Sequence, residues 1–170
     1  MNDPLVVEVA KLLQRAGNAE PFRDVVVIEG LVVGETTLVD GRVEIDLMLE
    51  AIVEGIAVGG QLSAAAVAPC RRCLNEVLLD LTLEVIEVFE TESEPGDTYP
   101  IDRDKTIDLR PMVREAILLA LPQLLLCAQD CAGPDPERFP TSGEMGDGAS
   151  EETNSSSDPR WAALDQLDFD

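Results

Sequence analysis

The side chains of this sequence best suited to chemistry are its four cysteines, which come as two close pairs. Cys70 and Cys73 are separated by two arginines, and Cys127 and Cys131 by three residues. Two such pairs, one from each half of a chain, supply the four thiolates of a tetrahedral structural zinc site. We therefore predict that Cys70, Cys73, Cys127 and Cys131 bind zinc. The gap between the pairs is longer than in a compact zinc ribbon, so other thiol chemistry stays open.

Three other interpretations of the cysteines remain. A redox pair belongs at a helix N-terminus in a βαβ setting, whereas the first pair here lies between two expected strands. An iron–sulfur cluster also takes four thiolates, and plain reduced cysteines need no ligand. In a cytoplasmic protein, reduced or metal-bound cysteines are more common than disulfides. Arg71 and Arg72 would offset the negative charge of a zinc ion held by four thiolates.

Composition excludes the catalytic mechanisms that depend on histidine. The sequence has no histidine, so it has neither an imidazole base nor an imidazole metal ligand. Residues 55–60 resemble a phosphate-binding loop but lack the Lys-Ser/Thr pair and the following helix. The many carboxylates are most simply solvated surface groups of an acidic chain. We expect a binding or assembly protein and not an enzyme.

The charge of the chain is strongly negative and unevenly distributed. The 170 residues include 12 Lys and Arg against 34 Asp and Glu, a formal net charge of −22. Residues 1–133 hold 10 basic and 24 acidic side chains, and residues 134–170 hold 2 and 10. Neutralising phosphates needs clustered Lys and Arg, so this balance argues against unaided binding to RNA or to an anionic membrane. It favours a basic protein partner, or serves simply for solubility.

Composition also divides the chain into three parts. Residues 1–133 are expected to form a folded domain, whose core must be built from Val, Leu, Ile and Ala because aromatic residues make up only 4%. Residues 134–157 are predicted to be a disordered acidic linker, because they are rich in Pro, Gly, Ser and acidic residues. Residues 158–170 carry an apolar island with helical spacing, which includes Trp161 and which we expect to dock on the body or on a partner. No signal peptide and no membrane-spanning run is apparent, so a cytoplasmic location is expected.

The folded part is expected to be mostly β-sheet. Apolar and polar residues alternate over residues 42–53 and 76–89, the pattern of half-buried antiparallel strands. Asp40-Gly41 is a hairpin turn signal before the first of these strands. Gly59-Gly60 indicates a bulge or bend in the stretch between them. Residues 91–105 are acidic and contain Pro-Gly, so they are expected to be a surface loop.

Helices are expected at two places. Residues 109–121 carry an apolar stripe, with Asp108 available as the N-cap and Pro122 as the stop. Residues 6–14 have a strand-like start and a helical end. The expected fold class is α+β: mainly an antiparallel sheet, curled toward a barrel, with one or two packed helices. Both cysteine pairs fall in expected loops, which suits metal knuckles.

The order of several short motifs resembles a known family. The motifs are residues 54–60, 70–74, 107–115, 121–122, 126–133 and 158–164. In this order they resemble the bacterial YceD family of large ribosomal RNA subunit accumulation proteins, of the actinobacterial type, over nearly the whole chain. The resemblance implies a cytoplasmic, non-catalytic protein that supports accumulation of 23S ribosomal RNA. One departure affects the zinc prediction: many members follow the second pair with a further Cys-x-x-Cys-Gly, and residues 133–140 here contain no cysteine.

The resemblance and the charge together indicate an indirect role at the ribosome. We expect the protein to act through a basic ribosomal protein or a pre-ribosomal particle. The candidate contacts to that partner or to RNA are Arg71, Arg72, Arg110, Arg114 and Trp161. The rival interpretation is a cysteine-based redox or zinc-responsive regulatory protein. A third is an acidic adaptor that binds an unrelated partner through its apolar island.

Overall fold

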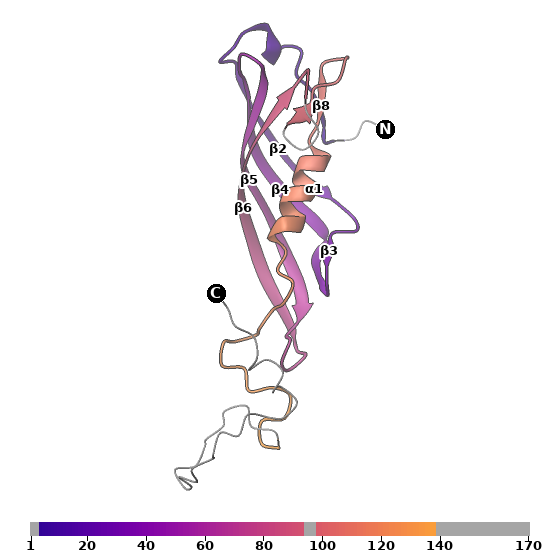
Figure 1. Ribbon diagram of the computed structural model, residues 1–170, viewed down its shortest axis with the longest axis vertical. Coiled ribbons are helices and arrows are strands. Elements are labelled where there is room, and N and C mark those ends of the chain that lie inside the picture. The colour runs from indigo at the N-terminus through magenta and orange to yellow at the C-terminus, as the bar shows by residue number, and fades with distance from the viewer. Residues whose placement is uncertain (1–3, 94–97, 139–170) are drawn as a thin grey trace, which may run out of the picture.

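The computed structural model describes residues 4–93 and 98–138, which form a long twisted sheet with a helix across one face (Figure 1). In chain order the elements are β1 (Val6–Glu8), the 3-10 helix η1 (Leu12–Gln14), β2 (Ala19–Val27), β3 (Val32–Val33), β4 (Thr36–Ala51), β5 (Gly55–Pro69), β6 (Glu76–Glu90), β7 (Tyr99–Pro100), β8 (Thr106–Asp108) and α1 (Arg110–Ala120). The protein is mostly β-sheet, and α1 is the one α-helix in the described part of the chain. The predicted docking segment 158–170, and the predicted linker beyond residue 138, lie outside the described residues.

The sheet is open. Its strand order is β2-β4-β5-β6-β7, with β3 also paired to β4, and β1 pairs separately with β8. These strand pairs are antiparallel except β6 with β7, where Phe89 lies beside Tyr99 in parallel. The expectation of a sheet curled toward a barrel is wrong, because the two outer strands do not pair with each other. Closure needs a continuous ring of paired strands, and β7 covers only the end of β6.

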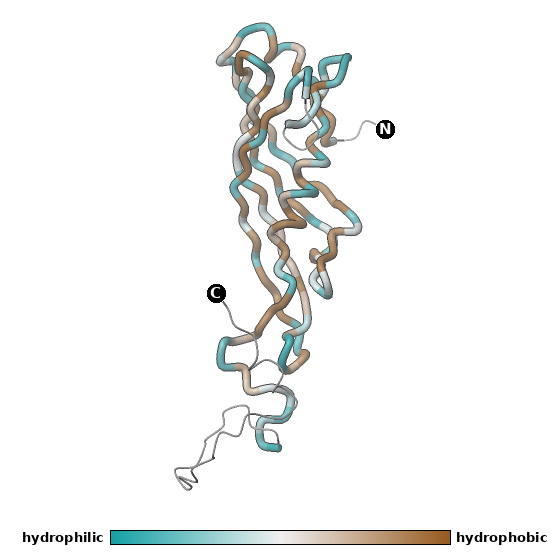
Figure 2. The backbone as a smooth tube through the Cα atoms, viewed as in Figure 1, coloured by the Kyte–Doolittle hydropathy of each residue, from teal (hydrophilic) through white to brown (hydrophobic). Residues whose placement is uncertain are grey.

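The long strands bury one face and expose the other, as their alternating sequences predict. In β4, alternate residues from Val43 to Leu49 are buried, whereas Glu44 and Asp46 are exposed. Figure 2 shows this alternation as changes of colour along the strands. The buried face is covered by α1 and by the β1–β8 pair. Each fully buried Val, Leu or Ile contributes about 1.5–3 kcal/mol. The buried residues of α1 are Met112, Val113 and Ile117.

One glycine signal has a different outcome from the one predicted, and the other gives no bulge. β4 runs without a turn through Asp40 and Gly41, which have φ angles of 54° and 64°, and its pairing with β5 shifts register across them. Asp40-Gly41 is therefore a bulge, and the predicted hairpin turn is wrong. At Gly60 the pairing is continuous on both sides, so there is no bulge. Glycine is required there because a Cβ atom would collide with the carbonyl oxygen of Asp46.

The helix and loop predictions are confirmed in part. Helix α1 lies within the predicted range, and the Asp108 carboxylate accepts a hydrogen bond of 2.9 Å from the N–H of Arg110. Residues 6–14 form β1 and the short η1, so no second α-helix forms there. The expected loop 91–105 contains β7, whose Tyr99 ring stacks on Phe89 with centroids 5.2 Å apart. Within residues 4–93 and 98–138, no helix is long and apolar enough to cross a membrane.

Candidate metal centre

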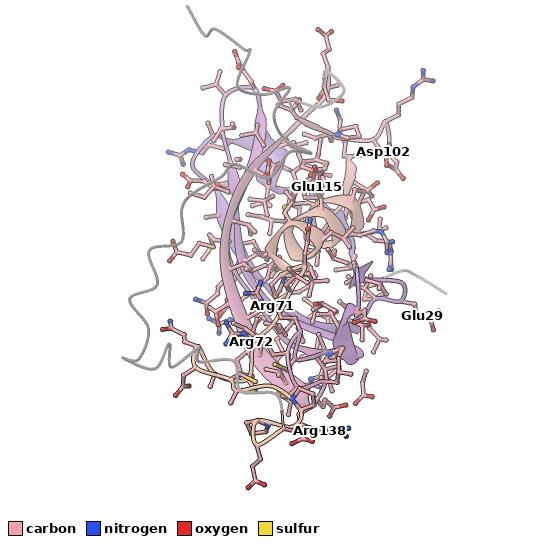
Figure 3. The ribbon with its side chains drawn as sticks, turned by 60° about the horizontal axis from the view of Figure 1, so that its bottom comes forward. Glu29, Arg71, Arg72, Asp102, Glu115 and Arg138 are labelled. Atoms are coloured by element: carbon pink, nitrogen blue, oxygen red, sulfur yellow. The ribbon has the colours of Figure 1, made fainter. Side chains whose placement is uncertain are left out.

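The four cysteines meet at one end of the sheet. Cys70 follows β5 and Cys73 precedes β6, so the first pair forms the tip of the β5–β6 hairpin. Cys127 and Cys131 lie in the segment that leaves α1 and runs to the same tip (Figure 1). In Figure 3 the sulfur atoms lie together near the labelled Arg72. The fold thus brings together two pairs that are far apart in the sequence.

The sulfur positions fit a four-coordinate metal. The Sγ atoms of Cys70 and Cys131 are 3.8 Å apart, and those of Cys73 and Cys127 are 3.7 Å apart. All four ligand atoms lie within 4.8 Å of one another. A sulfur tetrahedron at the zinc–sulfur distance of about 2.3 Å has edges of about 3.8 Å. The cysteines are free thiols, since a disulfide would bring two sulfurs to about 2.05 Å. The cluster is compatible with one ion at its centre.

Main-chain hydrogen bonds fix the first pair. The N–H of Cys70 donates to the carbonyl oxygen of Asn75 at 2.8 Å, and the N–H of Leu74 donates to that of Cys70 at 2.9 Å. The N–H of Arg72 lies 3.5 Å from Cys70 Sγ and favours the thiolate. Leu74 has a φ of 62°, a left-handed conformation that costs about 1–2 kcal/mol for a residue with a Cβ atom. The tight turn therefore holds both sulfurs in place at the expense of strain at Leu74.

The segment that carries the second pair is attached to the sheet by a few specific contacts. Leu125 forms a parallel bridge with Cys70 and accepts a hydrogen bond of 2.9 Å from the N–H of Arg71. Thr36, a fully buried residue of β4, donates from its hydroxyl to the carbonyl oxygen of Pro122 at 2.7 Å. These contacts set where the segment crosses β4 and β5. They bring its cysteines to the hairpin tip.

The arginines of the first pair have different surroundings. Arg72 Nη1 donates to the carbonyl oxygen of Cys131 at 2.9 Å and to that of Gln129 at 3.4 Å. The Arg71 side chain is exposed and makes no hydrogen bond or ion pair with a described residue. Arg72 therefore links the two cysteine pairs, whereas the guanidinium of Arg71 is open to an anionic partner.

The other candidate contact residues lie elsewhere. Arg110 and Arg114 belong to α1, along the middle of the sheet and away from the cysteine end (Figure 1). Arg114 donates to the carbonyl oxygens of Glu29 at 3.0 Å and Gly30 at 3.1 Å, so it holds α1 against the loop between β2 and β3. Trp161 lies outside the described residues. Of the four candidates that the structure describes, Arg71 and Arg72 lie beside the cysteine cluster and the other two do not.

The thiols perturb one another's ionisation. Backbone N–H groups, first those of Cys73 and Cys127 and then that of Arg72, lower the pKa of Cys70 to about 6. Hydrogen bonds with the thiols of Cys131, Cys73 and Cys70 raise the pKa of Cys127 to about 12. The metal-free cluster therefore holds one thiolate readily and resists ionisation of Cys127. A divalent cation at its centre would offset the repulsion between neighbouring thiolates and so favour ionisation of all four cysteines.

The arrangement suits a structural ion better than redox chemistry or an iron–sulfur cluster. The Cys-x-x-Cys pair lies on a hairpin and not at a helix N-terminus, where the dipole activates redox thiols. The sulfurs are close enough to enclose one ion, without room for a cluster of several irons. Because protein thiols fill all four corners, no open position remains for a substrate.

Sequence reasoning missed three residues that shape this centre. Asn75 and Leu74 close the turn around the first pair. The shortness of the connection between the two expected strands could have indicated them, because a tight turn needs a residue in the left-handed conformation. Thr36 binds a carbonyl group 86 residues away along the chain, so no local pattern indicates it.

Comparisons with known proteins identify a family that matches most of the chain. The family described as Large ribosomal RNA subunit accumulation protein YceD matches residues 58–168. An uncharacterized protein of Mycobacterium tuberculosis is 30% identical over 173 residues, which cover 96% of this chain and 81% of the relative. The uncharacterized protein YlbN of Bacillus subtilis is 32% identical over 110 residues, 62% of each chain. No solved structure matches significantly. Because the matched range spans most of the chain and all four cysteines, the chain belongs to the YceD family of large ribosomal RNA subunit accumulation proteins.

Proposed function

We propose that this protein is a cytoplasmic, non-catalytic assembly factor that supports accumulation of the 23S ribosomal RNA, with a structural zinc ion at its four-cysteine centre. The description of its family supports the ribosomal role. The observation that carries the proposal is the sulfur cluster, which lies within the matched residues and joins the hairpin tip to the segment after α1. Such a centre rigidifies a surface and leaves no metal position open for a reaction.

Zinc is the ion that the ligand set favours. Four thiolates at tetrahedral spacing are soft ligands and fit zinc better than calcium or magnesium, which prefer oxygen. Protein purified without chelators is expected to contain about one zinc ion per chain by metal analysis. The double variant Cys70→Ser/Cys131→Ser should contain almost none, with circular dichroism as the check on its fold. Wild-type protein that carries no metal would contradict the zinc centre.

A basic ribosomal protein or a pre-ribosomal particle is the partner that the charge favours. The net charge of −22 repels free RNA, whereas a basic protein is attracted to it. Direct RNA contact, if the particle offers one, belongs at the exposed Arg71 beside the metal centre. A pull-down at two salt concentrations tests this: electrostatic capture of a ribosomal protein should be lost at high salt. Capture that is unaffected by salt would argue for another kind of contact.

The cellular role has its own test. Depletion of the protein should lower the ratio of 23S to 16S ribosomal RNA, and wild-type protein should restore it. The cysteine double variant should not restore it if the metal centre is needed. An unchanged ratio after depletion would contradict the proposed role.

A second candidate function is a cysteine-based redox or zinc-responsive regulator. It is favoured by the exposure of Cys127, whose Sγ lies 3.7 Å from that of Cys73. A peroxide would oxidise these two thiols to a disulfide and be reduced to water, and two remaining thiolates would hold a metal weakly. Counting free thiols before and after peroxide treatment separates the candidates. A regulator loses two thiols reversibly and releases its metal, whereas a structural centre keeps both.

A further inference from the structure

Over most of its length, the outer edge of β6 pairs with no strand that the structure describes. β7 pairs only with Phe89 and Glu90, so residues 76–87 form a free edge within the described part of the molecule. The opposite edge strand, β2, is shorter and contains Pro21, which protects it from further pairing. β6 contains neither proline nor lysine. The charges that protect this edge are all acidic, so they deter an acidic strand but not a basic one.

The main-chain groups of alternate β6 residues point out of this edge. The carbonyl oxygen of Glu90 accepts a hydrogen bond of 2.8 Å from the N–H of Ile101, on the side away from β5. Hydrogen-bonding groups alternate in direction along a strand. The N–H and C=O groups of Thr82, Glu84 and Ile86 therefore face outward too. They are placed to pair with an added strand, as in other cases of β-augmentation.

An acidic cavity of about 290 Å³ lies beside this edge, on the side of the helix. Glu87 of β6 and Glu115 of α1 line it, together with Met112, Leu119 and Tyr99. The Tyr99 hydroxyl donates to Glu115 Oε2 at 2.8 Å, and neither carboxylate forms an ion pair with a described residue. Two carboxylates beside apolar side chains suit a lysine or arginine. The aliphatic stem of such a residue can pack on the apolar side chains while its charged end meets the carboxylates.

We propose that an extended, lysine- or arginine-rich segment of a partner protein adds to the edge of β6 as a further strand and places a basic side chain in the cavity. The choice of a basic protein rests on the proposed function. The position of Glu87, between the buried Val85 and Phe89, supports the geometry because it puts this carboxylate on the helix side of the edge. Alternate side chains of an added strand point to that same side.

Charge decides between possible occupants of the edge. The acidic residues of β6, which has no basic residue, are Glu76, Asp80, Glu84, Glu87 and Glu90. A second copy of β6 would bring like charges together across the new pair, which is destabilising. Segment 158–170 of the same chain has four acidic residues against one basic residue, so it is disfavoured for the same reason. On the opposite face of β6, Ile86 and Leu78 are 82% and 69% exposed and offer apolar contact to the added strand.

The test uses the full chain and a labelled peptide of alternating valine and lysine residues, with binding followed by fluorescence anisotropy. The variant Glu87→Gln/Glu115→Gln should weaken binding about ten-fold. The matched control Glu20→Gln/Glu50→Gln removes two exposed carboxylates from β2 and β4 and should leave binding within about two-fold of wild type. A peptide N-methylated at alternate amides keeps its charge but loses strand pairing, so it should not bind. In the complex with the unmodified peptide, hydrogen exchange should slow at Glu84 and Ile86.

Each other result overturns a definite part of the proposal. Equal binding of the N-methylated peptide would exclude strand addition, and equal loss in both double variants would exclude the cavity. Failure of the wild-type protein to bind the peptide would exclude the surface itself and leave the ribosomal role untouched. That role fails separately, if depletion leaves the 23S to 16S ratio unchanged while the peptide still binds.

Discussion

The guanidinium of Arg72 donates a hydrogen bond of 2.9 Å to the carbonyl oxygen of Cys131. The residue that stands between the first two cysteines thereby holds the backbone of the last one. The two halves of the metal centre are joined by this contact as well as by their sulfur atoms. Because the Arg72 side chain is largely exposed, the contact contributes about 1.5 kcal/mol, at the lower end for a hydrogen bond to a charged group.

Substituting Arg72 should weaken metal binding. Arg72→Ala removes the bonds to Cys131 and Gln129, and loss of a partner that orients a ligand typically costs about ten-fold in metal affinity. Competition with a chromophoric zinc chelator measures this directly. Arg71→Ala is the matched control, since it removes the same charge without removing a hydrogen bond between described residues. Equal effects of both variants would show that charge, and not the contact to Cys131, matters.

Leu74→Gly should stabilise the protein. Leu74 has a φ of 62°, and its side chain is 71% exposed, so glycine relieves backbone strain with little loss of buried surface. We expect the free energy of unfolding, measured with urea, to rise by about 1 kcal/mol. Leu74→Ala keeps the Cβ atom and should change stability little. A less stable glycine variant would mean that the Leu74 side chain contributes more than its exposure indicates.

The alternating strands and the grouping of the cysteines could be predicted from sequence because each depends on a local pattern. In β4 and β6 one face is solvated, so polar and apolar residues alternate residue by residue. Each cysteine pair sits within one turn, which keeps two sulfurs close whatever the rest of the fold does. The meeting of the two pairs is expected from the hypothesis of a four-ligand metal site, and the four sulfurs do lie within 4.8 Å of one another.

The features that sequence could not predict depend on distant partners. Asp40-Gly41 correctly indicates a left-handed backbone, but whether such a residue pair makes a hairpin or a bulge is decided by the strand opposite. The open sheet depends on whether two edges meet, and β7 pairs with β6 through only two residues. The position of Thr36 under Pro122 likewise depends on tertiary packing. These are relationships between segments, and no single segment carries them.

Metal affinity should rise with pH. Cys127, with its pKa raised to about 12, and Cys73, whose pKa is also raised, are protonated at neutral pH in the metal-free protein, so zinc must displace both protons. Apparent zinc affinity should therefore increase by at least about a hundred-fold per pH unit near pH 7, two protons being released. Isothermal titration in buffers of different ionisation enthalpy counts these protons.

The variant Cys127→Ser provides the control for proton release. It removes one titrating ligand, so zinc binding should release about one proton fewer. The apparent zinc affinity should therefore rise about ten-fold less steeply per pH unit. Cys70 contributes little to the slope above pH 7, because its pKa is already lowered to about 6. An affinity that does not change with pH would mean that zinc is not held by these thiolates.

Tyr99, the one tyrosine of the chain, should titrate above its ordinary pKa of about 10. Burial raises this pKa first, followed by the hydrogen bond to Glu115 and then by the charges of Glu115 and Glu87, since each disfavours a phenolate. Phenolate absorbance gives the midpoint without interference from another tyrosine. Glu115→Gln should lower the midpoint toward 10, and Glu50→Gln should not.

The raised pKa of Tyr99 also makes the stability of the fold depend on pH. The folded protein keeps the Tyr99 proton to a higher pH than the unfolded chain does. The stabilisation is therefore complete below pH 10 and is lost as the pH rises through the folded-state pKa. A midpoint at or below 10 in the wild-type protein would mean that the carboxylates beside Tyr99 do not act on it. It would also remove the negative potential with which the cavity between α1 and β6 attracts a basic side chain.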